Sequence, residues 1–63
     1  MKHLLFVKNL NGQEDAERIR EAFTDSRVEY EIILDRKCVV IYGRNDIVRA
    51  AKTLLAEAGF IVQ

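Results

Sequence analysis

Residues 7–23 read V-K-N-L-N-G-Q-E-D-A-E-R-I-R-E-A-F, and the spacing of the hydrophobic residues changes within this stretch. The apolar, β-prone run 3–8 ends at the turn-forming segment 9–12, which predicts a first strand followed by a turn. From Gln13 onward the apolar residues recur at helical spacing, which predicts a first helix. We expect Asn11 and Glu14 to cap the start of that helix. The apolar stripe of the helix consists of Ala16, Ile19, Ala22 and Phe23.

Downstream of this helix the sequence predicts a β-hairpin. Apolar and polar residues alternate over 28–34, the turn-forming segment 35–37 follows, and 38–42 is a second β-prone run. A second helix is predicted over 45–58, where the apolar residues recur at helical spacing and stop at Gly59, a residue suited to a helix C-terminus. Residues 60–62 then predict a terminal strand.

The predicted order is strand, helix, strand, strand, helix, strand over a single domain, residues 1–63. It matches an α+β, ferredoxin-like βαββαβ sandwich, in which two helices cover one face of a four-stranded antiparallel sheet. The alternation of side chains predicts which residues face the helices, namely Leu5, Val7, Tyr30, Ile32 and Val40. The same alternation predicts an apolar patch on the uncovered face, formed by Leu4, Phe6, Val39 and Ile41. An exposed patch of this kind indicates an interface.

Composition excludes several classes of function. Ten basic and ten acidic side chains give zero net charge, so no charge-driven binding to nucleic acid or to an anionic membrane is expected. Cys38 is the single cysteine, which rules out an intrachain disulfide and fits a reducing, cytoplasmic location. The apolar run 4–7 is too short for a signal peptide or a membrane span, so no membrane insertion is expected.

The same residues 7–23 resemble, without a gap, the metal-binding loop and first helix of heavy-metal-associated (HMA, copper-chaperone-like) domains. That family reads V-x-G-M-T-C-x-x-C-x-x-x-I-x-x-A-L. Residues 55–62, L-A-E-A-G-F-I-V, also resemble the family's closing pattern I-x-x-A-G-Y/F-x-V. The resemblance implies the ferredoxin-like fold and, as one partner, a metal-transporting ATPase.

The resemblance places Gly12 and Asp15 at the positions of the family's two metal-binding cysteines, so the site is degenerate. It also places Leu10 where the family has a Met under the metal loop, and Phe60 where the family has an aromatic residue beside the site. Thiolates select soft ions such as Cu(I), and Gly12 has no ligand to offer. Asp15 alone cannot build the shell of oxygens that Ca²⁺ or Mg²⁺ requires. We therefore expect no bound metal or cofactor, and we expect Asp15 to stabilise the positive end of the helix.

Cys38 is the one residual metal ligand that the sequence suggests. We expect it at the loop end of its strand, near Asp15, where a weak site is an alternative to the interpretation of Cys38 as a small hydrophobic residue. His3 is expected at the opposite end of the sheet, more than about 10 Å away. These two side chains then cannot share a metal ion or form a nucleophilic pair. Since no Gly-rich phosphate loop is present either, we expect no catalytic residues and no enzyme.

Residues 5–10, L-F-V-K-N-L, also resemble the first-strand motif of RNA-recognition domains, typically L-F-V-x-N-L. Phe6 would then be a base-stacking residue on the open face of the sheet. The corresponding third-strand motif lacks its aromatic residues, because 36–43 reads R-K-C-V-V-I-Y-G. RNA binding is therefore the more distant alternative.

The sequence thus predicts a small, non-catalytic interaction module derived from a heavy-metal-associated domain. Its partner is expected on the open sheet face, as another protein or as a second copy in a homodimer. The alternative is a carrier of copper or zinc that uses Cys38, completed by ligands of a partner. The arginines, Arg18 among them, are scattered along the chain and are expected to serve solubility.

Overall fold

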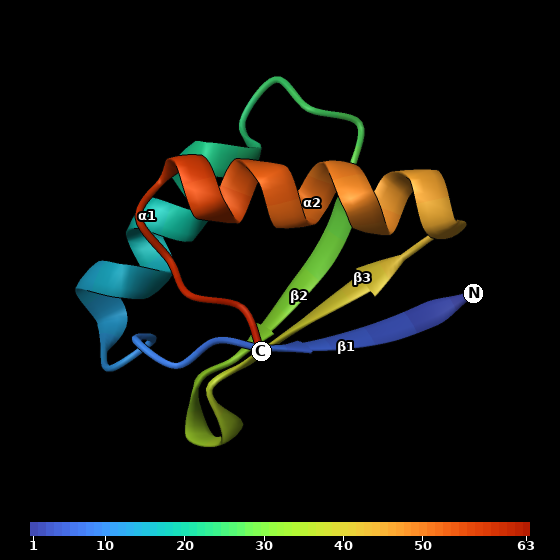
Figure 1. The fold of residues 1–63 in the computed structure, drawn as a ribbon. Helices are drawn as coiled ribbons and strands as arrows, with labels where there is room; N and C mark the ends of the chain where they lie inside the picture. Colours follow the sequence, from blue (N-terminus) through green and yellow to red (C-terminus); the bar gives the residue numbers. More distant parts are fainter.

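The computed structural model describes all 63 residues, as three strands, two α-helices and one short 3₁₀ helix. Both α-helices lie on the same side of the sheet, and no element lies on the other side (Figure 1). In chain order the elements are β1 (Lys2–Phe6), α1 (Gln13–Phe23), β2 (Glu29–Ile33), η1 (Leu34–Arg36), β3 (Cys38–Tyr42) and α2 (Asn45–Glu57).

The sheet is antiparallel, with strand order β1-β3-β2. The apolar strand β3 lies in the centre, where its backbone pairs on both sides. Val39 stands opposite Leu5 of β1 and Ile32 of β2. The turn between β2 and β3 contains the 3₁₀ helix and closes at Lys37, which adopts a left-handed conformation with φ 51°.

The predicted four-stranded sheet is wrong, because the C-terminal segment does not form a strand. After α2, Phe60 is drawn into the core, and the residues that follow form one isolated bridge, between Val62 and Val7, just beyond the end of β1. Two backbone hydrogen bonds flank this bridge, from Lys8 N–H to Ile61 C=O (2.9 Å) and from Gln63 N–H to the C=O of Phe6 (2.8 Å). One bridge is too short for a ladder, so the structure is α+β with a three-stranded sheet.

The assignment of β3 side chains to the two faces is also wrong, by one residue. Val39 and Ile41 were expected on the open face, but both are fully buried in the core below the helices, and Val40 lies on the open face instead. The register explains this, since Val39 pairs with the core residue Leu5, and paired residues share a face. A shift of one residue along a strand exchanges its two faces. The sequence of β3 alone cannot show which of its side chains face the helices, because the strand is apolar on both faces.

The core lies between the sheet and the helices. Each helix contributes residues at positions i, i+3 and i+7, which form one stripe along the helix. The aromatic rings of Phe23 and Tyr30 meet at 4.7 Å between their centroids, which joins the end of α1 to β2. The helix stripes are Ala16, Ile19 and Phe23 in α1, and Val48, Ala51 and Leu55 in α2.

Candidate functional site

Gly12 and Asp15 lie at the junction of the β1–α1 loop and the start of α1. The resemblance assigns these two positions to the metal-binding cysteines of the family. Gly12 is the N-cap of α1, in an extended conformation with φ −171°, and no side chain caps the helix there. Instead, an Asp15 carboxylate oxygen accepts a hydrogen bond of 2.9 Å from the backbone N–H of Asn11. The predicted capping by Asn11 and Glu14 is therefore wrong, and Asp15 is the acid that closes the loop.

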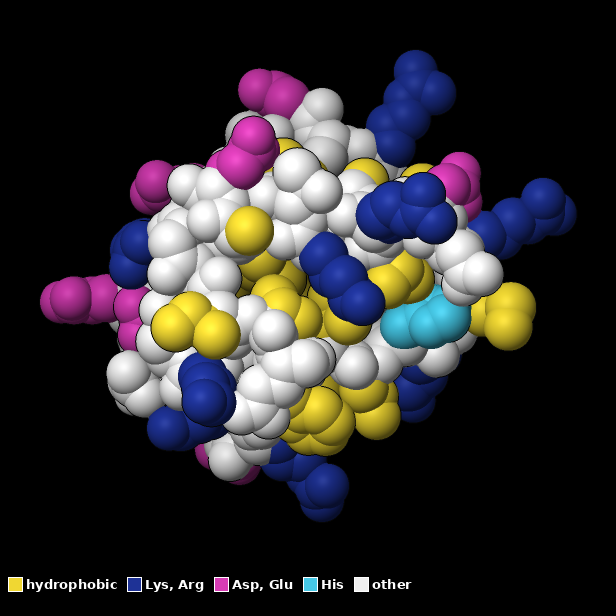
Figure 2. Space-filling model, viewed as in Figure 1, with side chains coloured by type: hydrophobic (Ala, Val, Ile, Leu, Met, Phe, Trp, Pro, Cys, Tyr) yellow, Lys and Arg dark blue, Asp and Glu magenta, His cyan; other side chains and the backbone are white.

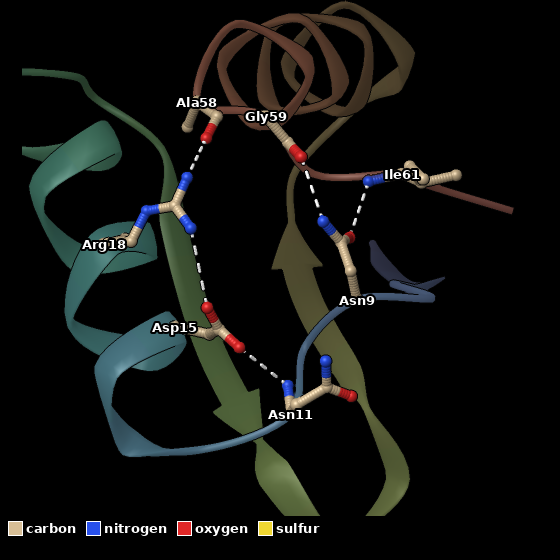
Figure 3. A network of polar contacts seen from close by, with 7 residues as sticks. All are labelled: Asn9, Asn11, Asp15, Arg18, Ala58, Gly59 and Ile61. Carbon is tan, nitrogen blue, oxygen red and sulfur yellow. Dashed lines mark hydrogen bonds and ion pairs between the residues drawn. The ribbon is translucent and has the colours of Figure 1, made fainter.

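Arg18 connects this loop to the end of α2 (Figure 3). One guanidinium nitrogen lies 3.5 Å from an Asp15 carboxylate oxygen, and the other donates a hydrogen bond to the backbone C=O of Ala58. The guanidinium also lies 4.8 Å from the centre of the Phe60 ring, a cation–π distance. The last turn of α2 contains no basic residue, so Arg18 provides the positive charge that complements the negative end of that helix.

α2 ends in a Schellman motif, which positions the Ala58 carbonyl for Arg18. The N–H of Gly59 bonds to the C=O of Ala56, and the N–H of Phe60 bonds to the C=O of Leu55. Gly59 has φ +92°, which an L side chain rarely adopts.

Asn9 ties the same loop to the C-terminal segment. Its side-chain amide donates to the C=O of Gly59 and accepts from the N–H of Ile61, each at 2.9 Å. Leu10, next to it, is completely buried, and Phe60 is almost so. We name the interacting set Asn9, Asp15, Arg18, Ala58 and Gly59 the loop clamp (Figure 3). At this end of the molecule the side chains hold the two helices and the terminal segment together.

Cys38 does not lie near Asp15, so that expectation is wrong. It pairs with Phe6 and Ile33 across the sheet, which places it on the open face, whereas Asp15 belongs to a helix on the other side. Cys38 is only 2% exposed. No group of three His, Cys, Asp or Glu side chains is arranged to hold a metal ion. A metal bound at Cys38 would need its other ligands from another molecule.

His3 stands opposite Ile41 on β3, three residues from Cys38 along the strand and on the opposite face. This face is the one below the helices, and the Nε2 atom of His3 is buried there without a hydrogen-bond partner. The register separates His3 and Cys38 by about 10 Å along the strand direction. Because they also lie on opposite faces of the sheet, their side chains are farther apart than this.

The open face of the sheet consists of three rows of side chains that follow the strand register. Val40 and Cys38 in the central strand are almost completely buried, although no helix covers them. Their neighbours on the edge strands cover them, and among these Leu4 is 52% and Phe6 47% exposed. The rows are Lys2, Tyr42 and Glu29, then Leu4, Val40 and Glu31, then Phe6, Cys38 and Ile33.

The apolar area continues past the end of β1. Ile61 lies opposite Lys8, on the same side as Phe6, and is 56% exposed. In Figure 2, hydrophobic side chains gather along the lower side of the molecule, which lies below the strands of Figure 1, with Lys and Arg side chains beside them. We call the set Leu4, Phe6, Ile33, Cys38, Val40 and Ile61 the open-face patch.

A shallow depression of about 290 Å³ adjoins the open-face patch at Phe6. Three basic side chains line it, namely Lys8, Arg36 and Lys37. These three positive charges lie together at this end of the face, although the net charge of the chain is zero. A depression of this kind suits a carboxylate or a phosphate.

At the other end of the face, the Tyr42 hydroxyl donates a hydrogen bond of 3.2 Å to a Glu31 carboxylate oxygen. Desolvation of the phenol raises the pKa of Tyr42 above its usual 10.0, and the charge and hydrogen bond of Glu31 raise it further. Tyr42 is 39% exposed, so the carboxylate contact on the sheet surface is the clearer physical cause. The raised pKa means that the Tyr42 phenol holds its proton more tightly than a free tyrosine does, with the Glu31 carboxylate as its hydrogen-bond acceptor.

Sequence reasoning missed Asn9 and Arg18, and it misjudged Arg18 as a solubilising residue. One signal was available, since α2 has no basic residue near its C-terminus and an arginine on the neighbouring helix can take that place. No family model, no curated protein and no solved structure matches this chain. The resemblance to heavy-metal-associated domains accordingly stays a prediction. Neither helix is long and apolar enough to span a membrane.

Proposed function

We propose that this domain is a non-catalytic protein-interaction module and that the open-face patch is its working surface. The observation that carries the proposal is the exposure of Leu4, Phe6 and Ile61 on a sheet face that no element of the chain covers. Small proteins rarely leave such a contiguous apolar area in water unless it meets a partner.

The construction of this face fits a protein partner better than a small ligand. Val40 and Cys38 form an apolar floor between the side chains of β1 and β2, and the face has no enclosed cavity there. Small-molecule sites are concave and bury most of the ligand. A flat apolar centre with a charged margin is the usual composition of a protein interface.

Site-specific photo-crosslinking in the producing cells tests the proposal. The photoreactive residue p-benzoylphenylalanine replaces Phe6, a substitution that keeps an aromatic ring on the open face. The control places it at Lys52, which is exposed on α2, on the opposite side of the molecule. We expect discrete protein adducts from position 6 that are absent from position 52 and that disappear when Leu4→Asp is added. Circular dichroism confirms that each variant is folded.

Equal adducts from the two positions, or none from position 6, would overturn the proposal. Adducts that a nuclease removes would also overturn it and favour RNA. The mass of each adduct further separates a second copy of this chain from a different protein.

A second candidate function, binding of single-stranded RNA, rests on the position of Phe6 beside the basic depression. An exposed aromatic ring next to Lys8 and Arg36 can stack one base and contact the phosphates that flank it. The one further aromatic residue of the central strand on this face is Tyr42, at the end away from Phe6, because Cys38 and Val40 occupy the nearer positions.

Fluorescence anisotropy with a labelled uridine oligonucleotide tests this candidate. Binding that falls with salt and is lost in Lys8→Glu and in Phe6→Ser would support it. Absence of binding at low salt ends it.

A further inference from the structure

We infer that the partner of the open-face patch is a second copy of this chain, turned over about a two-fold axis that runs parallel to the strands above β3. The inference rests on the proposed function and names its partner. It is carried by the charges on either side of the apolar centre.

These charges are segregated by strand. Lys2 stands on β1, and Glu29 and Glu31 stand on β2, all three exposed and on the open face. Lys2 and Glu29 even belong to one row, because both pair with Tyr42 of the central strand. At this end the face therefore has a positive margin on β1 and a negative margin on β2, with Tyr42 between them.

Rotation about an axis parallel to the strands makes this pattern self-complementary. It brings β1 of each copy over β2 of the other and keeps the rows in step. Lys2 then meets the partner's Glu29 and Phe6 meets the partner's Ile33, while the middle row places Leu4 against the partner's Glu31. The contact occurs twice by symmetry and closes the dimer, as expected for an isologous interface. Aligned sheets pack about 10 Å apart, which a lysine and a glutamate side chain span together.

The other rotation that brings the faces together is unfavourable. An axis perpendicular to the strands places each strand over its own copy and reverses the rows, so in the middle row Glu31 faces the partner's Glu31. Like charges facing each other across an interface weaken it. In the favoured arrangement Lys8 meets the partner's β2–β3 turn, where Asp35, Arg36 and Lys37 carry both signs.

The size of the face predicts a weak dimer. The molecule measures 27 × 21 × 16 Å, so one face is smaller in projection than the roughly 800 Å² that each partner contributes to a standard interface. We expect a dissociation constant in the micromolar range or above.

Sedimentation velocity from about 10 µM to about 1 mM tests the inference. We expect the wild type to pass from monomer to dimer within this range. Lys2→Glu and Glu29→Lys, each alone, should weaken the dimer about tenfold or more, because each creates two repulsive pairs. An equimolar mixture of the two variants should associate again, since each cross-strand pair of the resulting heterodimer once more joins a lysine to a glutamate.

Lys52→Glu is the matched control, with the same change of charge on the helix side, and should leave the dimer unchanged. A wild type that stays monomeric at the highest concentration would overturn the second copy as partner, while adducts of a different protein at position 6 would still support the interaction module. Weakening by Lys52→Glu to the same extent, or a mixture that does not recover, would overturn the proposed axis.

Discussion

The two faces of the sheet bury their central strand in different ways. On one face, Val39 and Ile41 are covered by two helices, and the loop clamp fixes those helices at one end. On the other face, Val40 and Cys38 are equally buried, yet only side chains of the neighbouring strands cover them. The helices of the chain cover the first face. On the second face, the side chains that cover the central strand are themselves exposed to solvent.

The difference indicates where stability and where function reside. Apolar burial between sheet and helices supplies most of the folding free energy of a domain this small. Leu4 and Phe6 contribute less, because about half of each side chain remains in water. Substitutions on the two faces should therefore separate stability from association.

The largest expected difference compares leucine truncation on the two faces. Leu55→Ala empties a completely buried position below the sheet and should lower the free energy of unfolding by about 3 kcal/mol. Leu4→Ala removes the same atoms from a half-exposed position and should cost less than about 1 kcal/mol. Urea unfolding followed by circular dichroism measures both. Equal losses would show that the open face is as important to stability as the core.

A smaller effect is expected from the glycine that ends α2. Gly59→Ala places a Cβ at φ +92° and 3.3 Å from an Arg18 guanidinium nitrogen, so it should destabilise the fold by about 1–2 kcal/mol. Gly12→Ala is the control, because the backbone there is extended and nothing lies within 4 Å of the added Cβ. Its cost should be smaller, about 0.5 kcal/mol, because the remaining effect is the preference for Gly over Ala at an N-cap. Thermal unfolding of the two variants distinguishes them, and similar melting temperatures would contradict the structure of the loop clamp.

Two arginines of α1 differ in what they contact: Arg18 bonds to the end of α2, whereas Arg20 bonds only within its own helix. Arg18→Ala removes the hydrogen bond to Ala58 and the cation–π contact with Phe60, and should cost about 1 kcal/mol. Arg20→Ala removes only an exposed ion pair with Glu17, and should change stability by less than about 0.5 kcal/mol. Urea unfolding at low and high salt is the measurement. If the destabilisation by Arg18→Ala disappears at high salt, the ion pair with Asp15 alone explains the contribution of Arg18, and the contacts with Ala58 and Phe60 contribute nothing.

The secondary structure was predictable because each α-helix carries an apolar stripe at helical spacing and each strand is a short β-prone run next to turn-forming residues. The apolar stripes of α1 and α2 and the hairpin of β2 and β3 lie where the spacing of the residues predicts them. The absence of a fourth strand could not be predicted, because the sequence of 60–62 is a β-prone run. Its failure to pair depends on the burial of Phe60 after the Schellman motif, a tertiary contact that a local pattern does not contain.

The composition of the open face was half predictable. Leu4 and Phe6 flank Leu5 in the sequence, so side-chain alternation places them on the face opposite the core residue Leu5. The structure places both on the open face. β3 is apolar throughout, so only its register with β1 decides that Val40, and not Val39 or Ile41, faces outward. The loop clamp was not predictable either, because it joins residues about 40 to 50 positions apart in the chain.

The smallest expected effect concerns the hydroxyl of Tyr42 at the polar end of the open face. Folding raises the pKa of this phenol, so the folded state holds the proton more tightly than the unfolded state does. The resulting stabilisation is complete below pH 10.0 and is lost as the pH rises through the raised pKa. Tyr42→Phe, which has no ionisable hydroxyl, should therefore lose less stability than the wild type between about pH 10 and the alkaline limit of the fold. Urea unfolding at several pH values measures this loss, and the absorbance difference between the two proteins during alkaline titration gives the pKa directly. A Tyr42 pKa at or below 10.0 would mean that the Glu31 carboxylate is not held over the phenol, and the acidic margin of the open face would then be mobile.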